Sequence, residues 1–234
     1  MFRRELALRL PAPARHNAVV RAETSRRAST PGKRARTAAN VLREYMPPET
    51  WYEPGDEPAG EYEIILQEAG KGFRHVITPE DVRERLGQLP GWMTFGLEYV
   101  HFSQMTRKKR RAPCYGMQWG TTIYLYPIEE TLVECFCQPP KPAQKIESAM
   151  FGGKWEIAEK RWKLIWTEDA IRDFYLNNVL IHELGHLLDS RNTNYADRER
   201  YAEWFAIEHG YKASRRQQFA ERAVKKLVKR RHHK

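Results

Sequence analysis

The sequence predicts an α+β domain, in which a small mixed or antiparallel sheet is followed by two long helices and flanked by basic tails. Segments rich in β-branched and aromatic residues lie between residues 61 and 166, and that composition is typical of strands. From residue 167 onwards, helix start signals and helical apolar spacing take over, and strands followed by helices are typical of α+β domains. The charge is also uneven, because residues 1–40 carry +8 and residues 212–234 carry +9, whereas the part between them carries −7.

These differences divide the chain into three parts. Residues 1–40 show no sustained periodicity and are rich in Arg, Ala, Pro and Ser, so we expect a basic, mostly disordered extension. Residues 41–211 are expected to form the folded domain, because a chain with 41% hydrophobic and 12% aromatic residues can close a core. Residues 212–234 are expected to form a basic amphipathic helix or tail. Its apolar residues recur at intervals of four: Phe219, Ala223 and Leu227.

The first half of the domain is predicted to consist mainly of strands. A short helix over Thr37–Tyr45 precedes them and is stopped by Pro47 and Pro48. Thr78 then places a capping hydroxyl ahead of Pro79 and two acids, which is a helix start. Strands are expected in five segments: Glu61–Gln67, Leu97–Phe102, Thr121–Tyr126, Leu132–Cys137 and Trp162–Trp166.

The second half is predicted to consist of two helices joined by a polar loop. Thr167 caps a helix that runs to about Leu188. The loop Ser190–Asn194 leads into a second helix from about Asp197 to Glu208, which Gly210 is expected to end.

Several classes of protein are excluded. No run of eighteen apolar residues occurs, so no segment is expected to span a membrane. The charged N-terminal stretch is not followed by the apolar segment of a secretory signal. Three cysteines, with Cys135 and Cys137 one residue apart, make neither a disulfide framework nor a zinc ribbon. A reducing compartment fits this cysteine usage, and we expect an intracellular, cytoplasmic protein.

The candidate chemistry lies in residues 182–186, which read His-Glu-Leu-Gly-His, the HExxH pattern. On a helix, residues four apart lie on one face, so His182 and His186 can both reach one ion. Glu183 follows the first histidine, where its carboxylate can take a proton from metal-bound water. Imidazole and carboxylate ligands in a tetrahedral site that keeps one position for water suit zinc. The sequence therefore predicts one Zn²⁺ per chain.

With this motif, the region from about residue 120 to 209 resembles the zincin metallopeptidases. Their gluzincin type fits, because Glu199-Arg-Tyr-Ala-Glu203 matches its E-x-x-A-D/E/N pattern on the following helix. The extended form looks like the ImmA/IrrE-type peptidases and the lethal-factor-type toxin domains. The resemblance implies a zincin-like fold in which Glu199 is the third zinc ligand and Glu203 is an acceptor for a ligand histidine. A rival register, starting at Glu203, would make Glu203 the ligand.

Three residues near the motif are considered alongside it. Tyr195, by similarity to such enzymes, is expected to donate a hydrogen bond to the oxyanion, with plain packing as the alternative. His209 is similar to the third-ligand histidine of SprT-like proteases, which repair DNA–protein crosslinks, and a helix C-cap is the alternative. Asp189 lies on the helical face of His182 and either supports the ligands or faces solvent.

The resemblance implies a zinc-dependent endopeptidase in which Glu183 is the general base. Its protein or peptide substrate would bind as an extra strand at a sheet edge beside the motif helix, formed by Thr121–Tyr126 or Leu132–Cys137. Two alternatives stay open: a nucleic-acid-binding protein with a structural or inactive zinc site, and an SprT-like DNA-associated protease. The basic tails are expected to bind phosphate backbones without sequence preference.

Overall fold

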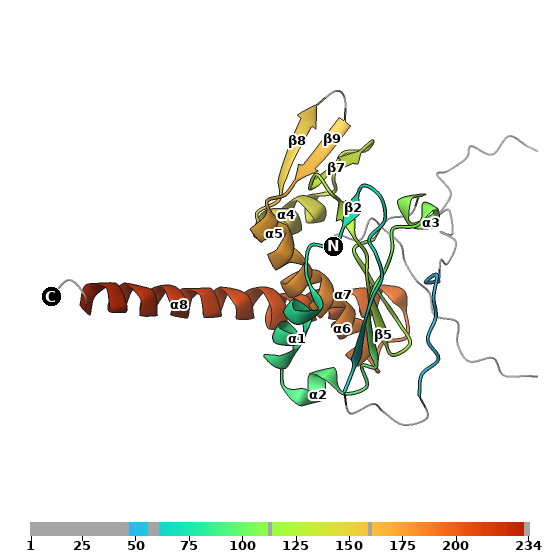
Figure 1. Cartoon of the computed structure of the whole chain (residues 1–234), viewed down its shortest axis with the longest axis horizontal. Helices are drawn as coiled ribbons and strands as arrows, with labels where there is room; N and C mark the ends of the chain where they lie inside the picture. The colour runs from blue at the N-terminus through green and yellow to red at the C-terminus, as the bar shows by residue number, and fades with distance from the viewer. Residues whose placement is uncertain (1–46, 56–60, 112–113, 159–160, 232–234) are drawn as a thin grey trace, which may run out of the picture.

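The computed structural model describes residues 47–55, 61–111, 114–158 and 161–231. Its architecture is α+β, as predicted (Figure 1). The expected extension over residues 1–40 and the short helix Thr37–Tyr45 lie outside the described residues. All three cysteines are free thiols, as their spacing suggested.

The main sheet has four strands in the order β1-β3-β5-β4. The strands span Glu63–Leu66 (β1), Tyr99–Phe102 (β3), Thr122–Leu125 (β5) and Gly116–Trp119 (β4). β1, β3 and β5 run parallel, whereas β4 runs antiparallel to β5. β5 is buried along its whole length because it lies between two strands, and β4 forms an edge of the sheet.

The edge strands of this sheet are therefore β1 and β4, and the expectation that Thr121–Tyr126 forms an edge is wrong. That segment contains β5, whose unbroken apolar and β-branched run suits an interior strand with both faces covered. The other expected edge strand, Leu132–Cys137, does lie at an edge, but of a separate three-stranded sheet. β4 was not predicted, because Gly-Met-Gln-Trp has no β-branched residue and includes a glycine.

A second sheet and a two-stranded ladder complete the described β structure. The second sheet is antiparallel, with the order β7-β9-β8. Its strands span Val133–Phe136 (β7), Arg161–Ile165 (β9) and Lys154–Ala158 (β8). The ladder pairs β2 (Phe73–Arg74) with β6 (Ile128–Glu129). Each of the five predicted strands has a counterpart. β8 was not predicted, and β2 and β6 were missed because two residues carry no periodicity.

Four short helices surround the sheets. They span Pro79–Gly87 (α1), Gly91–Thr94 (α2), Arg107–Arg111 (α3) and Pro142–Met150 (α4). The predicted start of α1 is confirmed as a capping box: Asp81 N donates to Thr78 Oγ1 over 3.3 Å, and Thr78 N donates to Asp81 Oδ2 over 2.8 Å. α4 was not predicted, and its Pro142 stands at the first helical position, which proline favours.

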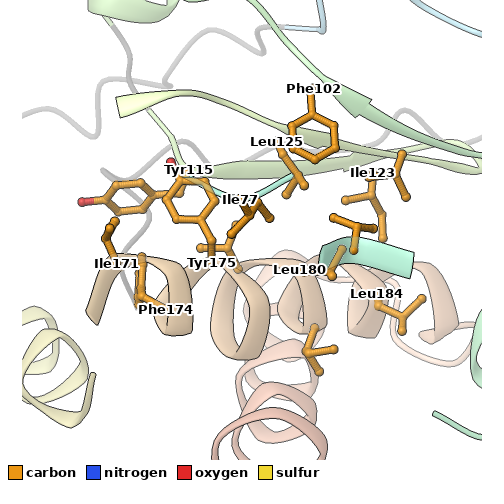
Figure 2. Packing of buried hydrophobic residues seen from close by; sticks show 14 of the residues in the cluster. Ile77, Phe102, Tyr115, Ile123, Leu125, Ile171, Phe174, Tyr175, Leu180 and Leu184 are labelled. Carbon is orange, nitrogen blue, oxygen red and sulfur yellow. The ribbon is translucent and has the colours of Figure 1, made fainter. Parts of the chain in front are cut away.

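The helix predicted from Thr167 to Leu188 is confirmed as one continuous rod. It consists of α5 (Glu168–Phe174), a π-helical segment η1 (Tyr175–Val179) and α6 (Leu180–Leu188). Figure 2 shows residues of its apolar face beneath the sheet, with Leu180 on the side of Ile123 and Leu125 and Phe174 near Tyr115. Burial of this face is the main force holding the rod on the sheet.

The second predicted helix is much longer than expected. It consists of α7 (Tyr195–Phe205), a π-helical segment η2 (Ala206–Tyr211) and α8 (Lys212–Arg231). The expected end at Gly210 is wrong, because this glycine serves close packing instead: a Cβ on Gly210 would lie 1.9 Å from the carbonyl oxygen of Asn177 in η1.

The part of the chain after Gly210 extends away from the body as α8 (Figure 1). Phe219, on this helix, is 76% exposed. No helix in the described ranges combines the length and apolar character needed to cross a membrane.

Candidate metal centre

The two motif histidines face one another on α6. His182 and His186 lie one turn apart, and their Nε2 atoms are 3.1 Å from each other. Both side chains are buried, at 8% and 5% exposure. The helix places both rings on the same side, as the spacing of four predicts.

Glu199 reaches this pair from α7. Its Oε1 lies 3.2 Å from His186 Nε2, and its Oε2 lies 3.7 Å from His182 Nε2. The three donor atoms all lie within 4.8 Å of one another, and the carboxylate is buried as well. Within the described ranges, no other three His, Cys, Asp or Glu side chains bring their ligand atoms this close together.

The chemistry of the three donors fits a divalent cation. Three electron-pair donors that converge in a buried space repel one another unless a proton or a cation lies between them. Two imidazole nitrogens and one carboxylate oxygen form the ligand set typical of catalytic zinc, which keeps a fourth position open. The residues present therefore fit the predicted metal, and the structure itself establishes the ligand group without the identity of the ion.

The close approach of the two helices depends on Gly185, inside the motif. A Cβ on Gly185 would lie 3.0 Å from Phe205 Cβ and 3.1 Å from Ala202 Cα, which is tighter than ordinary packing. Glycine therefore lets α7 cross α6 at the turn between the two histidines. This crossing brings Glu199, one turn before Glu203 on α7, over the histidine pair.

Arg198 ties the same helices together through the backbone. Its guanidinium donates to the carbonyl oxygen of His186 over 3.0 Å and to that of Asp189 over 3.1 Å. These carbonyls lie at the C-terminal end of α6, where the helix itself supplies no donors. Because Arg198 directly precedes Glu199, the cap on one ligand helix also fixes the position of the third ligand.

The short loop between the helices is held by side-chain turns. Asp189 Oδ1 accepts from Asn192 N over 3.1 Å, and Asn194 Oδ1 accepts from Asp197 N over 2.9 Å as the cap of α7. Asp189 is buried, so the solvent-facing interpretation is wrong. Its role is to shape the turn that returns the chain from α6 to α7.

Glu183, the candidate general base, is held by the edge strand. Its Oε2 accepts a hydrogen bond from the backbone N of Gln118 in β4 over 2.8 Å. A Cβ on Gly116 would lie 2.7 Å from Val179 Cγ1 and 2.9 Å from Glu183 Cγ. Only glycine therefore allows β4 to lie this close to α6.

The structure places the other candidate residues as follows. Tyr195 is the first residue of α7 and is half-buried, and its catalytic role stays a prediction. Glu203 lines a pocket beside His182, but the polar contacts of His182 are with His186 and Glu199, so the expected hydrogen bond to Glu203 is not formed at this histidine.

His209 lies away from the ligand group. Its ring packs against Phe205 with centroids 4.5 Å apart and against Trp204 with centroids 5.9 Å apart. Desolvation by these surroundings lowers the pKa of His209. The third side chain brought to the histidine pair is thus Glu199 and not the histidine that SprT-like proteases would use.

Sequence reasoning missed four residues that position the site: Gly116, Gln118, Gly185 and Arg198. Gly185 had a local signal, since a glycine in the middle of a buried helix requires a packing reason. Gly116 and Gln118 had none, because they act on a helix more than sixty residues away in the chain.

Comparisons with protein-family models, with curated proteins and with solved structures found no match to this chain. The assignment of function therefore rests on the geometry of the site.

Proposed function

We propose that this protein is a zinc-dependent endopeptidase. The observation that carries the proposal is the buried group of His182, His186 and Glu199, with Glu183 following the first of these ligands and held against a sheet edge. A purely structural zinc site typically closes all four positions with Cys and His. Here the described chain offers three ligands, so a bound zinc would keep a fourth position for water, and Glu183 directly follows the first ligand in the chain.

The residues divide the chemistry among them. His182, His186 and Glu199 would hold the zinc, which when bound polarises a carbonyl group and acidifies water. Glu183 would accept the proton of the attacking water and return it to the leaving amine. The hydrogen bond from Gln118 N to Glu183 Oε2 fixes the position of this carboxylate.

The edge strand supports a peptide as the substrate. β4 pairs with β5 on one side only within the described sheet, and on its other side Gln118 N donates to Glu183. The remaining outward backbone groups of β4 could pair with an extended peptide through main-chain hydrogen bonds. A peptide bound in this way would run past Glu183, because Gln118 of β4 contacts that residue. Binding along a strand suits cleavage within a chain, as an endopeptidase requires.

The test is zinc analysis combined with cleavage of casein or a peptide pool by the full-length protein. Wild type and Glu183→Gln should both hold about one zinc per chain, because Glu183 is not a ligand. The variant should lose at least about 10²-fold in hydrolysis, since an amide does not accept the proton. Glu130→Gln, an exposed carboxylate in the loop after β6, serves as the matched control and should keep wild-type activity. Undiminished cleavage by Glu183→Gln would refute the mechanism, and a zinc-bound wild type that cleaves nothing would favour a structural site.

A second function, binding of nucleic acid, is favoured by α8. Between Lys212 and Arg231 this helix carries nine Lys and Arg residues and one acid, and it extends away from the body (Figure 1). We propose that α8 binds phosphate backbones and places the peptidase near nucleic acid. This accessory role is compatible with Glu199 as the third ligand and does not require an SprT-like site.

A further inference from the structure

A pocket of about 250 Å³ opens directly beside the candidate metal centre. His182 forms part of its wall, together with residues of α4, η1, α7 and η2. Most of the wall is apolar, formed by Ala143, Ile146, Met150, Phe151, Ile207 and Tyr211. A side chain of a substrate bound at the metal would therefore find an apolar cavity within reach of the scissile bond.

The polar part of the wall carries negative charge. Glu147 on α4 and Glu203 on α7 both line the pocket. Glu147 Oε1 accepts a hydrogen bond from Asn178 Nδ2 over 2.5 Å, which fixes this carboxylate at the wall. Neither lysine nor arginine is among the lining residues, and His182 would be neutral as a metal ligand.

Arg215, which contacts the lining residues Tyr211 and Met150, is already engaged. Arg215 lies over the ring of Tyr211, 4.6 Å from its centroid. Its NH1 pairs with Asp173 Oδ2 over 2.7 Å, and its NH2 donates to the carbonyl oxygen of Met150 over 3.1 Å. Arg215 is therefore paired with Asp173 and is not among the described lining residues. The two glutamates outweigh the single net positive charge of a Zn²⁺ held by two neutral histidines and one carboxylate, so the cavity stays electronegative.

We propose that this pocket binds the side chain of a lysine or arginine next to the scissile bond, so that the enzyme selects basic peptides. The inference rests on the proposed peptidase function. The apolar wall would cover the methylene stem of the side chain, while its cationic end would donate to Glu147 or Glu203. An apolar side chain of the same length would desolvate the carboxylates without replacing their hydrogen bonds, and an acidic one would be repelled.

The first arm of the test measures binding independently of cleavage. Zinc-loaded, full-length Glu183→Gln is titrated into fluorescent eight-residue peptide mixtures whose central residue is fixed as Lys, Arg, norleucine or Glu, and anisotropy is recorded. Norleucine keeps an unbranched aliphatic stem and removes the charge. Lys and Arg mixtures should bind about tenfold more tightly than the norleucine mixture, the scale of a hydrogen bond to a charged group.

Variants then assign the preference to the pocket. Glu147→Gln and Glu203→Gln, added separately to the same protein, should each reduce the ratio of Lys to norleucine binding, and together they should bring it close to one. Glu130→Gln, a carboxylate outside the pocket, should leave the ratio unchanged. The melting temperature of each variant verifies that it is folded, and the change from Glu to Gln keeps the shape of the side chain.

The second arm maps the products of wild-type cleavage of a peptide library by mass spectrometry. A basic residue next to the cut is expected. If the Lys preference persists in the binding arm but wild type cleaves nothing, the pocket inference stands and the peptidase function fails. If cleavage occurs without a basic residue at the cut and the binding ratio is near one, the peptidase function stands and the pocket inference is overturned. It is also overturned if no mixture binds.

Discussion

The backbone N–H of Gln118 donates to Oε2 of Glu183 over 2.8 Å, so the candidate general base is positioned by the sheet edge rather than by its own helix. This hydrogen bond joins β4, where a peptide would bind, to the residue that would move the proton. Substrate binding and proton transfer would thus depend on the same strand.

Gly116→Ala should damage both stability and activity. The new Cβ would lie 2.7 Å from Val179 Cγ1 and 2.9 Å from Glu183 Cγ, so either β4 or the carboxylate must shift. We expect a loss of about 1–3 kcal/mol in the free energy of unfolding, the usual scale of overpacking, and a fall in hydrolysis. Chemical denaturation and a peptide assay measure these changes.

Gly87→Ala is the control for this substitution, because nothing lies within 4 Å of its Cβ position. Gly87→Ala should leave the free energy of unfolding unchanged or raise it slightly, because alanine lowers the conformational entropy of the unfolded chain. Equal effects of the two substitutions would contradict the close approach of β4 to α6.

Glu199→Ala should weaken zinc binding more than Glu203→Ala. Glu199 lies 3.2 Å from His186 Nε2, whereas Glu203 lines the neighbouring pocket. Loss of a ligand removes a metal bond, whereas loss of a supporting residue costs about 10–100-fold in affinity. Competition with a chelator measures the zinc affinity of each variant. A larger loss of affinity in Glu203→Ala would show that Glu203 is the third ligand.

His101 should contribute to acid lability. Desolvation, followed by the charge of His75, lowers the pKa of His101 below 6.5 in the folded protein. The unfolded chain then binds the proton more tightly, so the stabilisation is present above pH 6.5 and is lost as the pH falls below that value.

His101→Gln should therefore flatten the pH dependence of unfolding between about pH 7.5 and 5.5. Urea denaturation of both proteins measures it, and the contributions that the two proteins share cancel in the difference. An identical slope in both proteins would show that His101 does not titrate differently on folding.

The binding of duplex DNA should depend strongly on salt and on the end of α8. If about six phosphates are neutralised, log K against log salt falls with a slope of about −5. A chain that ends at Ala220 lacks seven Lys and Arg residues but keeps the ion pair of Arg215 with Asp173, so its slope should be shallower. Fluorescence anisotropy on a labelled duplex compares the two chains. Equal binding, or no binding at low salt, would exclude this role for the tail.

The sequence by itself determined the features that depend on near neighbours. The capped start at Thr167 and the apolar spacing after it predicted the helix that carries His182 and His186, since a cap and a helical face involve residues within one or two turns. The capping box at Thr78 was predictable for the same reason.

Only the tertiary structure decided which glutamate completes the site and which strand forms the sheet edge. Glu199 and Glu203 lie one turn apart on α7, and the sequence pattern by itself fits either of them as the third ligand. The crossing of α7 over α6 at Gly185 separates them, through contacts with Ala202 and Phe205 that arise only when the helices pack. Gly210 was predicted to end a helix, yet it allows η2 to approach Asn177. Such contacts join residues distant in the chain, and local propensity carries no information about which distant surface a residue will meet.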